Sequence, residues 1–282
     1  MRVRFASFAL LATLAACGGA SGPGAPAPGG ALSIRMPPAA EASFVKNDTV
    51  VVEVDTGVMG TIAINGHSDA TVGLSFTEDP AGFRATARYE ALQAAMDNPM
   101  GGTSQIGTSD VEGTLVFTVG PRGEASVHER FQVEGQAAQM VGNVSLAHEF
   151  FLRLPDRSVG VGDSWVDTLT VDETMEGVRN TNTTVTRYAI TGDTTVAGTR
   201  LLRITTESDV EMVAEGTMQG MSMSQTLSGT SSGWLLWDPQ AALLQESWSS
   251  GELSGAMVVD MPGAPDMTMS LTQRSHTRRA EP

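Results

Sequence analysis

Cys17 is the only cysteine of this 282-residue chain and the residue whose type and position most clearly offer covalent chemistry. It ends the stretch Leu14-Ala15-Ala16-Cys17, which directly follows a short apolar run. Because there is no second cysteine, the thiol has no intramolecular disulfide partner. The sequence therefore indicates a thiol available for modification near the start of the chain, and a fold that depends on its core for stability.

Other chemistry-bearing residues form no recognisable catalytic pattern. The four histidines, His67, His128, His148 and His276, are not spaced as the His-x-His or His-x3-His pairs typical of metal sites. No Gly-x-Ser-x-Gly elbow precedes a helix, and no glycine-rich stretch carries the lysine and hydroxyl of a phosphate loop. We expect a protein that is not an enzyme and that uses no cofactor.

Methionine is frequent, with 15 residues in the chain. Met218, Met221 and Met223 lie close together, and thioether sulfurs are soft ligands that select Cu(I). In strands, however, Met221 would share a face with Met223, and Met267 with Met269, as in an adaptable apolar lining. This pattern leaves three alternatives open: core packing, a pocket for an apolar ligand, and a copper site.

The first 16 residues have the layout of a secretory signal, with Arg2 and Arg4 before an apolar run of about ten residues and small residues after it. The run is shorter than the roughly 20 apolar residues that a membrane span needs. Leu14-Ala15-Ala16-Cys17 resembles the lipobox of bacterial lipoproteins, in which the cysteine is acylated and the preceding peptide is removed.

This resemblance implies a signal peptide at 1–16 and a mature chain that begins at Cys17 and carries palmitate-type acyl chains. Two or more such chains hold a protein stably on a membrane. Gly18, in place of an aspartate, implies the outer membrane, on its periplasmic face or at the cell surface. The expected location is thus the cell envelope, outside the cytoplasm.

Composition limits the partners of the mature chain. Residues 17–43 are rich in Gly, Ala and Pro and are expected to form a tether, followed by a single β-rich domain over 44–282. The net charge of -15 becomes -17 without residues 1–16, because Arg2 and Arg4 are lost and no acid is. Nucleic acid is excluded as a partner, since phosphate binding needs clustered Lys and Arg. Attachment to a membrane would rest on the acyl chains.

From Thr49 onward, short runs of Val, Thr, Ile and Leu alternate with turn residues, which predicts antiparallel strands. The clearest unit is a hairpin in which 114–119 and 124–133 flank the turn 120–123. Segments 81–87 and 113–117 resemble 197–203 and 233–237 at nearly equal offsets, which indicates two related halves, about 44–133 and 156–282. Val161-Gly162-Asp163-Ser164-Trp165 predicts a turn before an aromatic strand start, and it resembles a turn of uncharacterised all-β envelope lipoproteins.

One segment departs from this pattern. Apolar residues at helical spacing over 135–154, stopped by Pro155, predict a long amphipathic helix packed on the sheet. The expected fold is mainly β, a strongly curved antiparallel sheet or open barrel of roughly ten or more strands with this helix across it. That order of elements resembles half-barrel proteins of the lipoprotein-localisation type, which carry lipid in their concave face.

The leading hypothesis is a membrane-anchored envelope lipoprotein that binds an apolar ligand, such as an acyl chain, between sheet and helix. The lining expected for this ligand consists of Met140, Val144, Phe151, Met221, Met223, Met267 and Met269. The alternatives are a structural or protein-interaction module at the outer membrane, and a Cu(I) carrier through Met218, Met221 and Met223.

Overall fold

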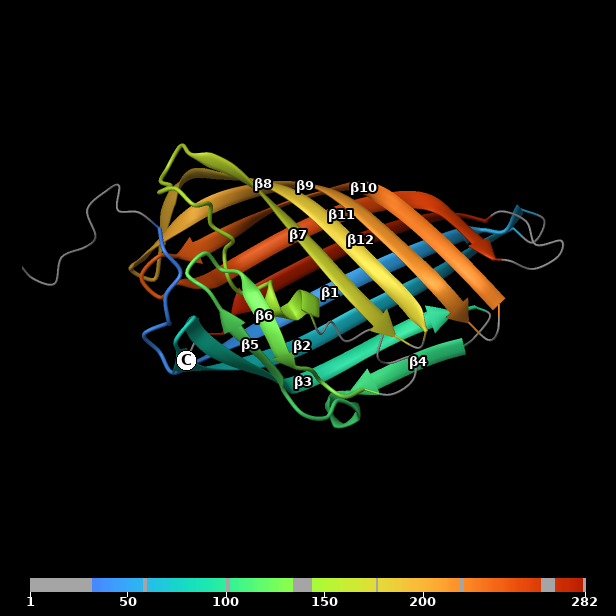
Figure 1. The fold of residues 1–282 in the computed structure, drawn as a ribbon, viewed down its shortest axis with the longest axis horizontal. Helices are drawn as coiled ribbons and strands as arrows, with labels where there is room; N and C mark the ends of the chain where they lie inside the picture. The colour runs from blue at the N-terminus through green and yellow to red at the C-terminus, as the bar shows by residue number, and fades with distance from the viewer. Residues whose placement is uncertain are drawn as a thin grey trace, which may run out of the picture.

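The chain folds into one large, curved, antiparallel sheet, as the sequence predicts. The computed structural model describes residues 32–57, 60–99, 102–133, 144–175, 177–218, 221–259 and 267–280. Twelve strands form the sheet in the order β6-β5-β3-β2-β1-β12-β11-β10-β9-β8-β7, and β4 pairs with β3 beside this path (Figure 1). The two meanders of the chain therefore meet where β1 pairs with β12, and β6 and β7 lie at opposite ends of the order.

The strands are long, and their bounds are as follows. They are β1 (Glu41–Asp55), β2 (Thr61–Asp79), β3 (Gly82–Asn98), β4 (Gly102–Gly107), β5 (Leu115–Val119), β6 (Ala125–Glu129), β7 (Ser164–Met175), β8 (Val178–Val196), β9 (Thr199–Met218), β10 (Met221–Asp238), β11 (Leu243–Val259) and β12 (Met267–Arg279). The short helices are the 3-10 helix η2 (Thr108–Asp110) and α1 (Val144–Ala147). Within the described ranges, no helix has the length and hydropathy that crossing a membrane requires.

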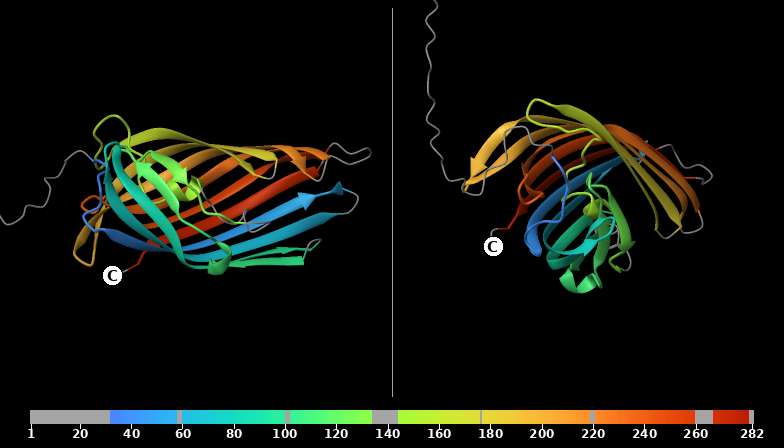
Figure 2. Two further views of the ribbon diagram at one scale, coloured as in Figure 1. Left: turned by 60° about the horizontal axis from the view of Figure 1, so that its bottom comes forward. Right: turned by 60° about the vertical axis from the view of Figure 1, so that its left-hand side comes forward.

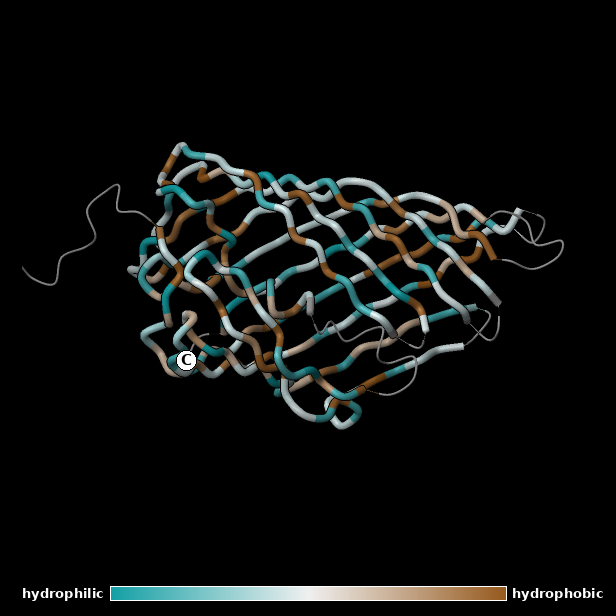
Figure 3. Tube along the Cα trace, in the orientation of Figure 1, coloured by the Kyte–Doolittle hydropathy of each residue, from teal (hydrophilic) through white to brown (hydrophobic). Residues whose placement is uncertain are grey.

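Glycines within the long strands do not end them. The sequence predicts short strands separated by turn residues, but β2, β10 and β11 run through Gly66, Gly233 and Gly255 without interruption. A Cβ at Gly255 would collide with the carbonyl oxygen of Thr226 on the neighbouring strand, so the backbones approach more closely there than a side chain allows. Figure 2 shows the arch that the sheet forms, and Figure 3 shows hydropathy alternating along the strands.

The predicted long helix over 135–154 is wrong for the part that the structure describes. Only Val144–Ala147 is helical, residues 148–154 form turns, bends and irregular chain, and 134–143 lie outside the described residues. The reason is that the backbone of this segment bonds to other elements: the amide of Leu244 donates to the carbonyl of Phe150, at 3.3 Å, and the amide of Leu154 donates to that of Arg122, at 2.8 Å. These tertiary bonds replace the helical ones.

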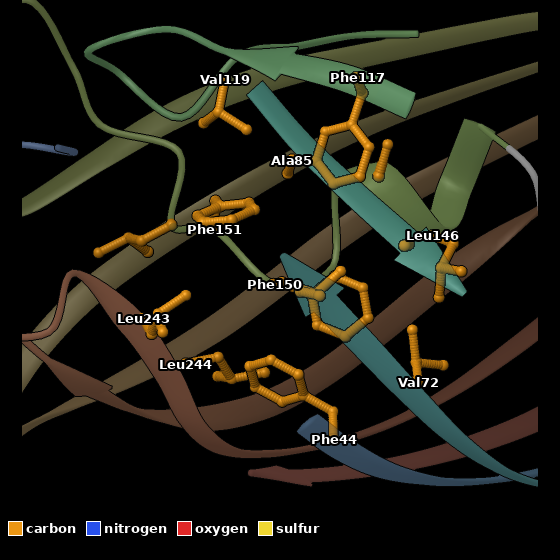
Figure 4. Packing of buried hydrophobic residues seen from close by; sticks show 14 of the residues in the cluster. Phe44, Val72, Ala85, Phe117, Val119, Leu146, Phe150, Phe151, Leu243 and Leu244 are labelled. Atoms are coloured by element: carbon orange, nitrogen blue, oxygen red, sulfur yellow. The ribbon is translucent and has the colours of Figure 1, made fainter. Parts of the chain in front are cut away.

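Segment 146–154, which we call the insert, fills one end of the arch with its apolar side chains. Phe150 contacts Phe44 of β1, with ring centroids 4.7 Å apart, and Phe151 contacts Phe83 and Phe117, at 5.3 and 6.2 Å (Figure 4). All five rings are buried. The insert therefore belongs to the main hydrophobic core, and the side of the sheet that bears Phe44 is its concave face.

The insert also connects the two halves of the sheet. Leu154 bonds to Arg122 in the turn between β5 and β6, while the indole Nε1 of Trp165 in β7 donates to the carbonyl of Arg153, at 2.8 Å. Farther along, Arg130, which follows β6, pairs with Glu173 of β7 at 3.4 Å. The insert thus bridges the arch at the core end, and the Arg130–Glu173 pair makes a second link farther along β7.

The segments that resemble each other in sequence occupy similar places. Segments 81–87 and 197–203 each enter a strand from a tight hairpin connection, between β2 and β3 and between β8 and β9. Segments 113–117 and 233–237 contribute to β5 and β10, which pair with β3 and β9.

Candidate functional site: the concave face of the sheet

Residues directly opposite each other on neighbouring strands point to the same face, so the register divides the concave face into rows. The unbroken register of β1 places Lys46, Asp48, Val50, Val52 and Val54 on the face of Phe44. Each of these residues begins a row that can be followed across the sheet. Beyond the core and Lys46, the next two rows are mainly polar, and the two rows after them are apolar.

The first two rows past Lys46 consist mainly of small and hydroxylated side chains, and we call them the hydroxyl rows. Their members are Ser68, Asp48, Ser275, Ser249, Gly233, Thr206 and Tyr188, and then Gly66, Val50, Gln273, Gly251, Ser231, Ser208, Thr186 and Asp167. Gln273 is exposed, and Asp48 keeps 34% of its side chain in solvent. This part of the concave face is therefore open and polar.

The next two rows are apolar from β2 to β9, and we call them the apolar rows. Their members are Ile64, Val52, Leu271, Leu253, Gly229 and Val210, and then Ile62, Val54, Met269, Gly255, Leu227 and Met212. Leu227, Leu253 and Val210 form a second hydrophobic cluster with Met212, Met269 and Leu271. Several members, including Val52, Ile64, Met269 and Leu271, are only partly buried.

The two apolar regions of the concave face are well separated. Val54 in the second apolar row follows Phe44 in the core by ten positions along β1, which corresponds to about 33 Å of strand. Across the sheet, perpendicular to the strands, the apolar rows span the six neighbouring strands β2, β1, β12, β11, β10 and β9, or about 24 Å. The apolar rows thus offer an elongated surface apart from the core.

Lys46 is the only lysine of the chain, and it holds the insert on the sheet. Its ammonium lies 2.7 Å from Asp48 and 3.0 Å from Glu149 of the insert, with 13% of the side chain exposed. Burial alone would lower the pKa of Lys46, but the two carboxylates outweigh this effect and raise it. Burial raises the pKa of Glu149 against the opposing influence of Lys46. The nearby Tyr89 hydroxyl also has a raised pKa, chiefly through burial.

His148 directly precedes Glu149 in the insert, and the charged groups that act on its ring are Arg153 and Asp167. Burial, with the nearby Arg153 guanidinium, lowers the pKa of His148 to about 4, so the ring is neutral at physiological pH. Its Nδ1 is buried and has no hydrogen-bond partner among the described residues. Arg153 pairs with Asp167 at 3.0 Å. Trp165 is buried and stacks on Tyr188 at 5.0 Å, which agrees with the predicted aromatic corner.

The structure does not bring the residues predicted to line a ligand pocket together. Phe151 is buried in the core, where the insert packs directly on the sheet. Met269 lies in the second apolar row, with Met267 and Met223 farther along the concave face. Met140 lies outside the described residues, as do the side chains of Val144 and Met221. The lining predicted between sheet and helix is thus divided between two ends of the strands.

For the copper alternative, the structure gives only the backbone positions of the methionines. Met221 and Met218 are paired directly opposite each other where β9 and β10 meet, and Met223 pairs with Gly216. The side chain of Met218 is also outside the described set. Among the residues that the structure describes, no three His, Cys, Asp or Glu side chains are grouped as a metal site.

Sequence reasoning missed Lys46 and, apart from Met269, the members of the apolar rows, which are the most informative residues of this face. The available signal was the alternation from Phe44 to Val54, in which every second residue changes from aromatic through charged to aliphatic. Once one residue of β1 is known to face inward, this alternation identifies the others, and Phe44 is that residue.

Comparison with known proteins adds little to this description. No family model and no curated protein matches the chain. Among solved structures, it is similar to DynF from the dynemicin biosynthesis pathway of Micromonospora chersina, at 8% identity over 92% of each chain with a TM-score of 0.26. It is also similar to OccK9 (OpdG) of Pseudomonas aeruginosa, at 8% identity over 85% of this chain and 98% of that one with a TM-score of 0.21. Such low scores support no argument, so function is argued from this chain's own residues.

Proposed function

We propose that this protein is an exported lipoprotein, anchored to the cell envelope through acyl chains on Cys17, that holds an apolar chain of a lipid on the apolar rows. The observation that carries the ligand is the pair of adjacent apolar rows facing the inside of an open arch. The observation that carries the anchor is the lipobox-like Leu14-Ala15-Ala16-Cys17 that ends the signal-like segment.

The binding energy would come from removing hydrocarbon from water. Each buried methylene contributes about 0.8 kcal/mol, so a chain that rests on Val52, Leu271 and Met269 gains several kcal/mol without a specific polar contact. Methionine suits such a surface because its flexible thioether adapts to different chain shapes. The glycines Gly229 and Gly255 within the apolar rows have no side chain, which leaves the surface low at these two positions.

A matched pair of valines tests this proposal. Val52 faces the concave side, and its neighbour Val51 faces the convex side with 37% exposure. The chain from residue 17 with Cys17→Ser retains every described residue and needs no detergent. Binding of the uncharged fluorescent probe N-phenylnaphthylamine should weaken at least fivefold in Val52→Gln and stay within twofold in Val51→Gln.

Two results would count against the ligand part of the proposal. One is the absence of probe binding to the unsubstituted protein, and the other is an equal effect of the two substitutions. Urea unfolding of both variants provides the control for stability, since a glutamine in a half-buried position also has a folding cost.

A further inference from the structure

We infer that the lipid held on the apolar rows is an amphiphile with an uncharged, hydroxylated head group, such as a monoacylglycerol, and not a fatty acid or another anionic lipid. This inference rests on the proposed function, because it specifies the head group of the ligand of that site. It is carried by the hydroxyl rows, which lie between the apolar rows and Lys46, and by the charges around them.

The hydroxyl rows are placed where the head of such a ligand would lie. They adjoin the apolar rows along every strand from β2 to β9, because each lies two residues farther toward the core. Their serines and threonines offer both donors and acceptors, and the carboxylate of Asp48, about one-third exposed, can accept hydrogen bonds from hydroxyls. A glycerol head would therefore find partners for its donors as well as its acceptors.

Among the described residues, an anionic head would find no unpaired cation on the concave side. The cations that the described residues bring to the concave side are Lys46, Arg153, Arg130 and Arg279, and each is already paired with a carboxylate. Their partners are Asp48 and Glu149, Asp167, Glu173 and Asp238, in that order. Carboxylates outnumber cations in this set, so a carboxylate or phosphate head would be repelled and left unpaired.

The two carboxylates around Lys46 are the groups that would repel an anionic head. Its ammonium is 13% exposed and lies between two carboxylates that are each about one-third exposed, so solvent meets acceptors before it meets the cation. Asp48 stands in the first hydroxyl row and is the part of this cluster nearest to a bound head. Removing its charge should make the site more tolerant of an anionic ligand.

Competition with N-phenylnaphthylamine at pH 8 tests the inference, with monopalmitoylglycerol and palmitate as ligands that have the same acyl chain and different heads. We expect monopalmitoylglycerol to compete at least tenfold more tightly. Asp48→Asn should reduce this ratio at least threefold. Asp69→Asn, on the convex face opposite Asn47, should leave the ratio unchanged.

Palmitate binding as tight as monopalmitoylglycerol would overturn the inference and leave the proposed function standing. Equal effects of Asp48→Asn and Asp69→Asn on the ratio would also overturn it, since the convex face cannot sense the head. A protein that binds the probe but is displaced by neither lipid overturns both the inference and the proposed ligand class, whereas the absence of probe binding contradicts the proposed function itself.

Discussion

Replacing Lys46 with methionine should destabilise the protein by about 2–3 kcal/mol at neutral pH. Losing one partner of a fully buried ion pair costs about 3–5 kcal/mol, and here the two carboxylates that remain are about one-third exposed, which lowers the cost. The methionine keeps most of the packing of the lysine stem, so the loss reports the charge. The weakened contact is the one between the insert and β1.

The assay is urea unfolding followed by tryptophan fluorescence. Arg187→Met provides the control, because the Arg187–Glu207 pair is 3.7 Å apart with both side chains more than 60% exposed, and its loss should cost under about 0.5 kcal/mol. As the pH falls toward 4, the unpaired carboxylates of the Lys46→Met variant take up protons and the difference from the unsubstituted protein should narrow. Since the pKa of Lys46 is raised, its own contribution persists through neutral pH and declines only in strongly alkaline solution.

Because Lys46 is the only lysine, a second readout is available. An amine-reactive reagent should modify Lys46 much more slowly in the folded protein than in urea. Equal stability of Lys46→Met and the unsubstituted protein at pH 7, or a stability difference that does not narrow in acid, would refute the reasoning about this cluster.

Three further predictions follow from the geometry. First, the His148→Gln variant should lose about 2 kcal/mol less stability than the unsubstituted protein when the pH falls from 7 to 4.5. The pKa of His148 is lowered to about 4 in the folded protein, so the contribution of the neutral ring to stability is present above pH 6.5 and is lost as the pH falls. Unfolding at the two pH values measures this difference. An unchanged pH dependence would contradict this. Second, Gly255→Ala should lower the free energy of urea unfolding by about 2–3 kcal/mol, because the new Cβ would collide with Thr226. Gly192→Ala, with open space around the residue, should cost under about 1 kcal/mol. Similar costs would mean that the close approach of the strands at Gly255 does not need glycine. Third, cells fed labelled palmitate should label the unsubstituted protein and not Cys17→Ala, and label in both would place the acyl chain elsewhere.

The strands could be predicted from the sequence, but their lengths could not. The hairpin of β5 and β6 was correct because Gly120-Pro121-Arg122-Gly123 separates two alternating runs. By contrast, Gly233 and Gly255 resemble turn residues, and only the sheet shows that they allow neighbouring backbones to come close. β7 begins at the predicted corner, but β4 carried no strong pattern and was missed.

The insert shows why the predicted pocket was misplaced. Phe150 and Phe151 are consistent with a helical stripe, but in the bend that they form they contact different parts of the core, Phe44 for one and Phe83 for the other. Nothing local distinguishes these two outcomes, because the deciding hydrogen bonds come from Arg122 and Leu244, far away in the chain. The alternation along β1, in comparison, is local information, and it correctly places Val52 and Val54 on one face.

Photo-crosslinking with a diazirine-bearing monoacylglycerol tests the central claim most directly, because it records which residues touch the bound chain. The account predicts adducts on concave-face residues of β11 and β12, such as Leu253, Met269 and Leu271, and none on the convex-face Val258. Adducts confined to the convex face, or spread equally over both faces, would show that the apolar rows are not the lipid site.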